Sequence, residues 1–586
     1  MTSPRSVIVQ GVAFAVLATL SWACNFIAPY VLHGYSIQDF MLVRFMMAGV
    51  LGFLLLPFYR SQLRGLRPRQ WLTGMSLGVL GYLAYSSCIA GGVIYGGPLL
   101  IAAFIGPGPV LDAFIVAFRL PNLFRRFFAE GAFNAAFVPA FAKRYEAGED
   151  ARTYAQQAFN LLAAAVLALV GLGMVFMPGL VWLTAGGFVG DARFDMAVGY
   201  GYIVFPYILF MSLAALFSGV LNATGRFAAA AAAPVLLNIF ACAAMAAGAL
   251  LGGDVIIWLV WTIPVAGVAQ LALVWGAAAR AGISLRPGLP RWNSGMRSLV
   301  RVAVPAALAM GVTQINLVVG QYVASDIEKA ASWLFIADRL YQLPLGVVGI
   351  AVGIVLLPAL SRRLRAGDSA GSQDALSRAG EFSLLLAVPS AIAFITVPLP
   401  LVSVLYERGA TGPEDVAAIA VAVAIYGAGL PAFMLQKVLQ PLYFAREDTS
   451  TPFRYALVAM AVNAALAFGL KPMLGWIAPA IAASAAGWAM VLLLALGARS
   501  MGEEARFDAR FRSRAWRILA ASAVMGAVLY GVAETAGWLF MLDYWRYLSM
   551  LGLVVLGGAV YFAAGQTLGA FRLSEFRSAL SRRKQV

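Results

Sequence analysis

The chain consists of long apolar runs separated by short polar segments over nearly its whole length. Most of the runs reach about twenty residues, which is the length of a helix that crosses the hydrocarbon core of a membrane. The pattern therefore predicts an all-α polytopic membrane protein with about sixteen transmembrane helices. We place these helices at residues 9–32, 39–58, 71–92, 109–138, 156–184, 196–221, 229–251, 254–278, 298–322, 331–360, 381–405, 415–444, 453–472, 475–498, 516–538 and 545–567.

The arginines and lysines predict how these helices are oriented. If the N-terminus is cytoplasmic, the loops on the inner side hold most of the basic residues, which agrees with the positive-inside rule. The loops on the outer side then carry little beyond Asp191, Arg193, Lys329 and Arg408. We therefore expect both termini to lie in the cytoplasm.

Composition narrows the classes of function. Of the 586 residues, 62% are hydrophobic and 12% are charged, and the net charge is +16. Because most arginines lie in loops between apolar runs, we attribute this charge to membrane topology and expect no nucleic-acid partner. The single histidine, His33, and three scattered cysteines offer no metal site, and the sequence holds no Walker loop or hydrolase motif. We therefore expect neither a cofactor nor an enzymatic activity.

The segment 111–139 carries charge at membrane depth. It contains Asp112, Arg119, Arg125, Arg126 and Glu130 within an otherwise apolar stretch. Ionisable residues at this depth are costly and usually face a protein interior or a watery cavity. The excess of arginine predicts an anionic cargo, because a guanidinium binds phosphate or carboxylate oxygens in pairs and stays charged. Snorkelling to lipid headgroups is an alternative for one of the two adjacent arginines.

A second charged segment lies in the predicted helix 331–360, which contains Ser332, Asp338 and Arg339. Asp338 and Arg339 are adjacent and point about 100° apart on a helix, so they need not pair with each other. An interhelical salt bridge is an alternative explanation for Asp338. This segment also resembles the first one. Both 119–139 and 339–358 begin with Arg-Leu, continue as a glycine-containing apolar helix and precede a basic loop. The repeat predicts two six-helix-like lobes around a central cavity.

From about residue 99 to its end, the chain resembles the MurJ/MviN-type lipid II flippases of the multidrug/oligosaccharidyl-lipid/polysaccharide exporter superfamily. The matching blocks are DAFIVAFRLPNLFRRFFAEGAFNAAFVP, FPYILFMSLAALFSGVLNATGRF, SWLFIADRLYQLPLGVVGIAVGIVLLPALS, LYERGAT and KVLQPLYFAREDTSTP. The resemblance implies a transporter of the bacterial inner (plasma) membrane. It would move lipid II, the undecaprenyl-diphosphate-linked peptidoglycan precursor, from the inner to the outer leaflet by alternating access.

The resemblance also implies roles for the charged residues. Asp112 and Asp338 would help to close the outer gate, and the arginines would meet the cargo's diphosphate. The predicted substrate-binding residues are Arg119, Arg125, Arg126, Glu130, Ser332 and Arg339. Lipid II and membrane lipids would be the partners. Sodium ions or the membrane potential are candidate driving forces, and cell-wall assembly proteins are candidate partners.

The N-terminal part departs from this family. Residues 9–92 resemble the opening of an EamA-type drug/metabolite transporter, through LSWACNFIAPYVL and MLVRFMMAGVLGFLLLP. The family's arginine-rich first helix is replaced here, with Gly97-Pro98 at the position where its Arg-Asp pair would end. We therefore expect a three-helix fusion at 1–98, an N-lobe at 99–280, a C-lobe at 281–500, and a helix pair with a basic tail at 501–586. Two other functions stay open, a small-molecule exporter and an inactive fusion that acts as a scaffold.

Overall fold

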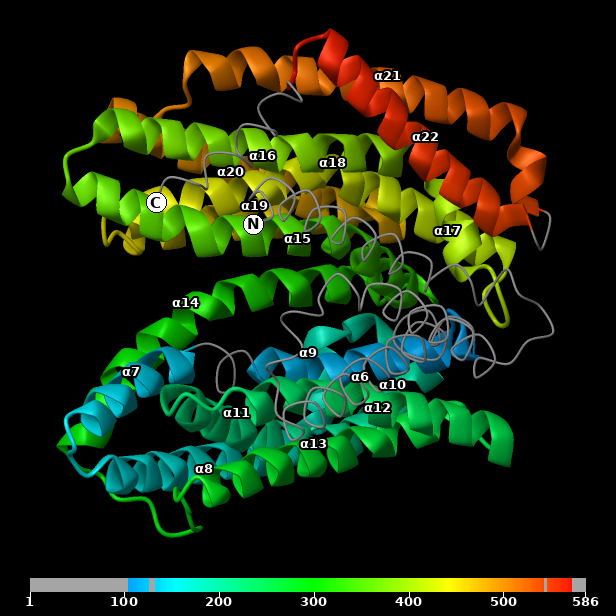
Figure 1. Cartoon of the computed structure of the whole chain (residues 1–586). Helices are drawn as coiled ribbons and strands as arrows, with labels where there is room; N and C mark the ends of the chain where they lie inside the picture. The colour runs from blue at the N-terminus through cyan, green and yellow to red at the C-terminus, as the bar shows by residue number, and fades with distance from the viewer. Residues whose placement is uncertain (1–103, 126–131, 542–544, 572–586) are drawn as a thin grey trace, which may run out of the picture.

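A computed structural model describes residues 104–125, 132–541 and 545–571 (Figure 1). The regular elements in these ranges are all helices, which confirms the all-α prediction. The α-helices are α6 (Pro109–Arg125), α7 (Ala132–Glu146), α8 (Ala151–Val175), α9 (Met177–Thr184), α10 (Ala192–Val204), α11 (Tyr207–Ala223), α12 (Ala228–Leu251), α13 (Val255–Arg280), α14 (Ser294–Ala324), α15 (Ala330–Arg365), α16 (Ser369–Thr396), α17 (Pro398–Tyr406), α18 (Pro413–Phe444), α19 (Ser450–Leu474), α20 (Ala478–Ala498), α21 (Ala509–Thr535) and α22 (Trp545–Thr567). Short 3₁₀ turns are η4 (Gly186–Phe188), η5 (Gly475–Ile477), η6 (Arg499–Met501), η7 (Glu503–Ala505) and η8 (Gly537–Met541).

The described part of the chain contains nine helical stretches that are long and apolar enough to cross a membrane. The protein is therefore a multi-pass membrane protein. The larger number of about sixteen helices stays a prediction. The spans and the three-helix segment predicted within residues 1–98 lie outside the described residues.

The helices gather into two bundles (Figure 1). The first bundle is α6 to α13, and its apolar core runs from Leu111 on α6 to Leu299 at the start of α14. The second bundle is α15 to α22, which surrounds separate apolar clusters. Helix α14 runs between the two bundles and packs against α7 on one side and α19 on the other. Buried apolar area thus stabilises each bundle largely by itself.

Side-chain caps define where several helices begin. The carboxylate of Asp150 accepts a hydrogen bond from the backbone N–H of Thr153 at 3.0 Å, and α8 starts at the next residue. Asp254, Asn293, Asp368 and Asp508 cap α13, α14, α16 and α21 in the same way. Such caps satisfy backbone donors that have no partner within the helix, and each one contributes about 1 kcal/mol.

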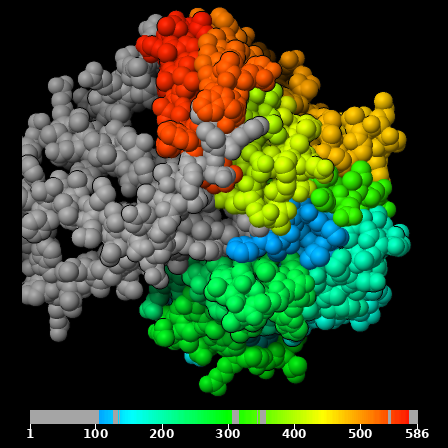
Figure 2. Space-filling model, turned by 90° about the vertical axis from the view of Figure 1, so that its right-hand side faces the viewer, coloured from blue at the N-terminus to red at the C-terminus, as the bar shows by residue number. Residues whose placement is uncertain are grey.

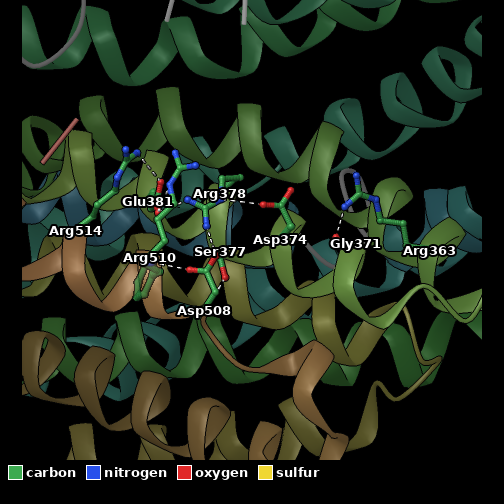
Figure 3. Close-up of polar contacts among 10 residues, drawn as sticks. Arg363, Gly371, Asp374, Ser377, Arg378, Glu381, Asp508, Arg510 and Arg514 are labelled. Atoms are coloured by element: carbon green, nitrogen blue, oxygen red, sulfur yellow. Dashed lines mark hydrogen bonds and ion pairs between the residues drawn. The ribbon is translucent and has the colours of Figure 1, made fainter. Parts of the chain in front are cut away.

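Helix α21 packs on the outer face of α16, and α22 packs mainly against α21 (Figure 1). The hydroxyl of Tyr561 on α22 donates a hydrogen bond to the carbonyl of Leu385 on α16 at 2.9 Å. Near the start of α21, a polar network joins α21 to α16 (Figure 3). Arg378 on α16 contacts the carboxylates of Asp374, Glu381 and Asp508. The pair is therefore fixed to the second bundle by both apolar and ionic contacts.

Candidate functional site

The two bundles are joined at one end through the carboxylate of Asp112, which is fully buried on α6. This carboxylate accepts hydrogen bonds from the backbone N–H groups of Lys329 and Ser332 at 2.7 and 2.9 Å. It also accepts one from the Ser332 hydroxyl at 2.5 Å. These donors lie at the N-terminal end of α15, so Asp112 of the first bundle acts as the N-cap of a helix in the second.

A buried arginine approaches the same carboxylate from within the first bundle. Arg193, in the first turn of α10, is 4% exposed, and its Nη1 lies 3.6 Å from Asp112 Oδ2. Its Nε donates to the Asp191 carboxylate at 2.6 Å, and its guanidinium lies 4.5 Å from the centre of the Phe188 ring. The negative charge of Asp112 is therefore stabilised from both bundles.

Further contacts close this end of the molecule. The Gly187 N–H donates to the Ser325 hydroxyl at 2.9 Å, and the Gln321 amide donates to the Thr184 carbonyl at 3.2 Å. Gly106, just before α6, approaches Ala410 so closely that a Cβ on it would lie 2.5 Å from the Ala410 carbonyl oxygen. Figure 2 views this end, where the start of α6 (blue) lies against the α17–α18 region (yellow-green). We call the contacts of Asp112, Arg193, Ser325, Lys329 and Ser332 the Asp112 junction.

A second charged group lies further along α15. The Asp338 carboxylate accepts hydrogen bonds from Tyr341 and Gln342 of its own helix. It also interacts electrostatically with Arg119 of α6 and with the adjacent Arg339. Arg119 in turn reaches the Leu317 carbonyl of α14 at 3.5 Å. The structure thus brings the predicted residues Arg119 and Asp338 together across the two bundles.

Arg339 differs from its neighbours because it is exposed. Its guanidinium lies 4.8 Å from the centre of the Phe335 ring, and the described residues include no carboxylate within ion-pair distance of it. A guanidinium whose face is stacked still presents its N–H edges to a ligand. Arg339 can therefore bind an anion without first releasing a carboxylate.

The remaining predicted residues are less informative. Arg125 is the last residue of α6 and is half-buried. Arg126 and Glu130 lie outside the described residues. The predicted gate residues Asp112 and Asp338 belong to different groups, since Asp338 follows Ser332 by about 9 Å along α15. Within the described ranges, no group of three or more histidines, cysteines, aspartates or glutamates is placed to hold a metal ion.

Sequence reasoning missed Arg193. The charge pattern placed it among the few charges of outer loops, where an arginine is expected to be solvated. In the structure it is buried beside Asp112 instead. No local signal in the sequence distinguishes it, because its role depends on α10 packing against α6.

Comparisons with known proteins cover most of the chain. A family model described as "Lipid II flippase MurJ" matches residues 101–556. The chain is 42% identical over 497 residues to the probable lipid II flippase MurJ of Rhizobium tropici, an alignment that covers 83% of this chain and 93% of that protein. It is 33% identical over 491 residues to the lipid II flippase MurJ of Burkholderia cenocepacia, covering 82% and 94% of the two chains.

Solved structures share the fold. A lipid II flippase MurJ in an inward closed conformation superposes with a TM-score of 0.70 at 24% identity, covering 83% of this chain and 98% of that chain. An inward-facing multidrug resistance transporter of the MATE family, from the MOP superfamily, gives a TM-score of 0.56 at 14% identity, covering 71% and 93%. The family match and the level of identity over most of its length lead to one conclusion: the chain belongs to the lipid II flippase MurJ family.

Proposed function

We propose that this protein is a flippase that moves lipid II from the inner to the outer leaflet of the bacterial inner membrane. The observation that carries the proposal is the 42% identity, over 83% of the chain, to a relative described as a probable lipid II flippase. The family transports a lipid rather than catalysing a reaction, which agrees with the prediction that the chain is not an enzyme. The same comparisons do not favour the small-molecule exporter or the scaffold.

The chemistry of the cargo explains why exposed arginine is useful here. A lipid-linked diphosphate carries negative charge that cannot cross an apolar layer without compensation. Arg339 offers an exposed guanidinium that forms no ion pair with a carboxylate of the described residues, although the adjacent Asp338 interacts with it electrostatically. Arg119 faces Asp338, so its charge is partly balanced. We propose that Arg339 supplies the main contact to the diphosphate, with Arg119, Arg125, Arg126, Glu130 and Ser332 completing the substrate site.

Alternating access follows from the separation of the bundles. We propose that the two bundles are the lobes of the transporter and that the Asp112 junction closes the outer side of a cavity between them. The opposite ends of α7 and α15 carry basic residues, which favours the cytoplasm on that side. These residues are Lys143, Arg144, Arg362, Arg363 and Arg365. Separation at the junction would then expose the cargo to the outer leaflet.

The finer assignments follow from the same reasoning. We propose cytoplasmic termini, Asp338 as a second gate residue and the division into 1–98, 99–280, 281–500 and 501–586. Sodium ions and the membrane potential are the candidate driving forces, and cell-wall assembly proteins are candidate partners. The family match begins at residue 101, so the N-terminal segment is the part that most needs a direct test.

Complementation of a bacterium depleted of its own flippase tests this function. The full chain is compared with a version in which residues 1–98 are replaced by the first helix of a family member, at matched membrane expression. Rescue by both versions supports a flippase that works with its natural N-terminus. Rescue by the repaired version alone assigns flippase activity to residues 99–586 and a defect to the fusion. Failure of both versions, despite normal expression, would contradict the proposed function.

A further inference from the structure

The Asp112 carboxylate loses its hydrogen-bond donors when the two bundles separate. In the closed junction it accepts three hydrogen bonds from the N-terminal end of α15, which belongs to the other bundle. Separation removes all of them together. Until water reaches it, a buried carboxylate that loses its donors is left with unsatisfied acceptors, which raises the cost of the first step of opening. A second partner for this charge within the first bundle would lower that cost.

Arg193 has the geometry of such a partner. Its Nη1 lies 3.6 Å from Asp112 Oδ2, slightly beyond hydrogen-bond distance. The same nitrogen is buried and has no hydrogen-bond partner. An approach of about 0.7 Å, from 3.6 Å to the usual length near 2.9 Å, would complete a charge-assisted bond. Arg193 Nη1 therefore lies close to the Asp112 carboxylate but does not form a hydrogen bond with it in the closed junction.

Two neighbouring residues hold the Arg193 guanidinium in place beside Asp112. Its Nε is bonded to Asp191 at 2.6 Å, and its guanidinium stacks on Phe188. Both of these residues, like α6 and α10 themselves, belong to the first bundle and would move with it. The arginine therefore stays beside Asp112 in either state, whereas the donors of Lys329 and Ser332 do not.

We propose that Arg193 is a positioning residue for transport that receives the Asp112 carboxylate when the bundles part. In the closed state Asp112 caps α15, and in the open state it bonds to Arg193. This exchange of partners keeps the charge compensated throughout the cycle and lowers the cost of opening. The inference rests on the proposed alternating access, but it concerns the equilibrium between closed and open states, whatever the cargo is.

Opposite effects of two variants test the exchange. Asp112→Asn weakens the cap on α15 and should favour the open state. Arg193→Ala leaves that cap in place but removes the alternative partner, so it should favour the closed state. A purely structural arginine that helps to close the junction would instead make Arg193→Ala favour opening. The sign of the change therefore separates the two roles.

The measurement is the labelling rate of a cysteine at the junction in purified protein in nanodiscs. Ala324→Cys reports on a fully buried position at the end of α14, and Ala330→Cys gives a second one at the start of α15. Cys24, Cys88 and Cys242 are first replaced by alanine. We expect Asp112→Asn to raise the maleimide labelling rate about tenfold, and Arg193→Ala to lower it about fivefold.

Three controls complete the design. Arg193→Lys, which keeps the charge, should restore most of the native rate. Arg226→Ala removes an exposed arginine from the same bundle and should leave the rate unchanged. In an Asp112→Asn background, Arg193→Ala should have little further effect, because the charge it serves is gone. Faster labelling in Arg193→Ala, or an undiminished effect in that background, would overturn the proposal. Because no cargo is present, these outcomes do not depend on the lipid II assignment.

Discussion

Arg339 and Arg378 lie on neighbouring helices of the second bundle but in opposite electrostatic settings. Arg378 on α16 contacts three carboxylates, those of Asp374, Glu381 and Asp508 (Figure 3). Arg339 on α15 is exposed and forms no ion pair with a carboxylate of the described residues, although the adjacent Asp338 interacts with it electrostatically. An arginine that is already matched by carboxylates joins helices. An arginine that is not matched keeps its charge for a ligand.

The Arg378 network and the Asp112 junction also differ in which helices they connect. The Arg378 network is confined to α16 and the start of α21, two elements of one bundle. The Asp112 junction instead crosses between bundles and depends on backbone donors at a helix end. Ionic contacts within a bundle resist motion, while the proposed cycle requires the single shared carboxylate of Asp112 to change partners. In the proposed cycle, the second bundle therefore stays fixed while the Asp112 junction separates.

Arg339→Ala should give the largest functional effect. It removes the unmatched guanidinium, and charge-assisted hydrogen bonds to an anion contribute about 1.5–3 kcal/mol, so transport should fall about 100-fold. Growth rescue in flippase-depleted cells should be lost. Thermal stability should stay nearly unchanged because the side chain is exposed. Arg362→Ala, an exposed arginine at the far end of the same helix, is the matched control and should rescue normally.

In contrast to Arg339→Ala, Glu381→Ala should reduce the stability of the fold strongly. Glu381 is 9% exposed and serves Arg378, Arg510 and Arg514 together. Its loss leaves three arginines without their shared carboxylate, which should lower the free energy of unfolding by about 2 kcal/mol. Thermal unfolding in detergent measures this change. An unaltered midpoint with lost transport would mean that the network serves the cargo rather than the fold.

Arg339→Lys sharpens the comparison with a smaller change. Lysine keeps the positive charge but cannot form two parallel hydrogen bonds to a phosphate. We expect partial rescue, with transport reduced about tenfold. Flipping of a fluorescent lipid II in proteoliposomes gives the rate directly. Full activity would indicate that Arg339 acts only through its charge.

Sequence reasoning located the helices well where apolar length alone sets their bounds. The predicted span 545–567 coincides with α22, Trp545–Thr567. Helix α16, in contrast, begins at Ser369, twelve residues before the predicted start at 381. Its first turns are polar and include Asp374 and Arg378, and the Asp368 cap and ion pairs stabilise them. Hydropathy does not detect a helix that is held by such contacts.

The sequence singled out Asp112 and Ser332 of the Asp112 junction, but it could not show how they are arranged. Charge at membrane depth singled out Asp112, and Ser332 followed from the resemblance to the family. Their direct bond joins positions 220 residues apart, and no local pattern encodes it. The backbone donor of Lys329 has no signature in a sequence at all. The contact between Arg193 and Asp112 was not foreseen, because counting charges in loops cannot show that an arginine is buried against another helix.

The smallest predicted effects on stability concern Arg510 and Arg514, two arginines of the Arg378 network. Arg514 has a side chain that is 13% exposed and lies 3.4 Å from Glu381, while Arg510 is 46% exposed at 3.5 Å. Water screens the more exposed pair, so Arg510→Ala should cost less than about 0.5 kcal/mol of unfolding free energy. Arg514→Ala should cost about 1 kcal/mol. Thermal unfolding of both variants at low and high salt checks the order. Equal losses would mean that distance, rather than exposure, controls what each arginine contributes to the fixed bundle.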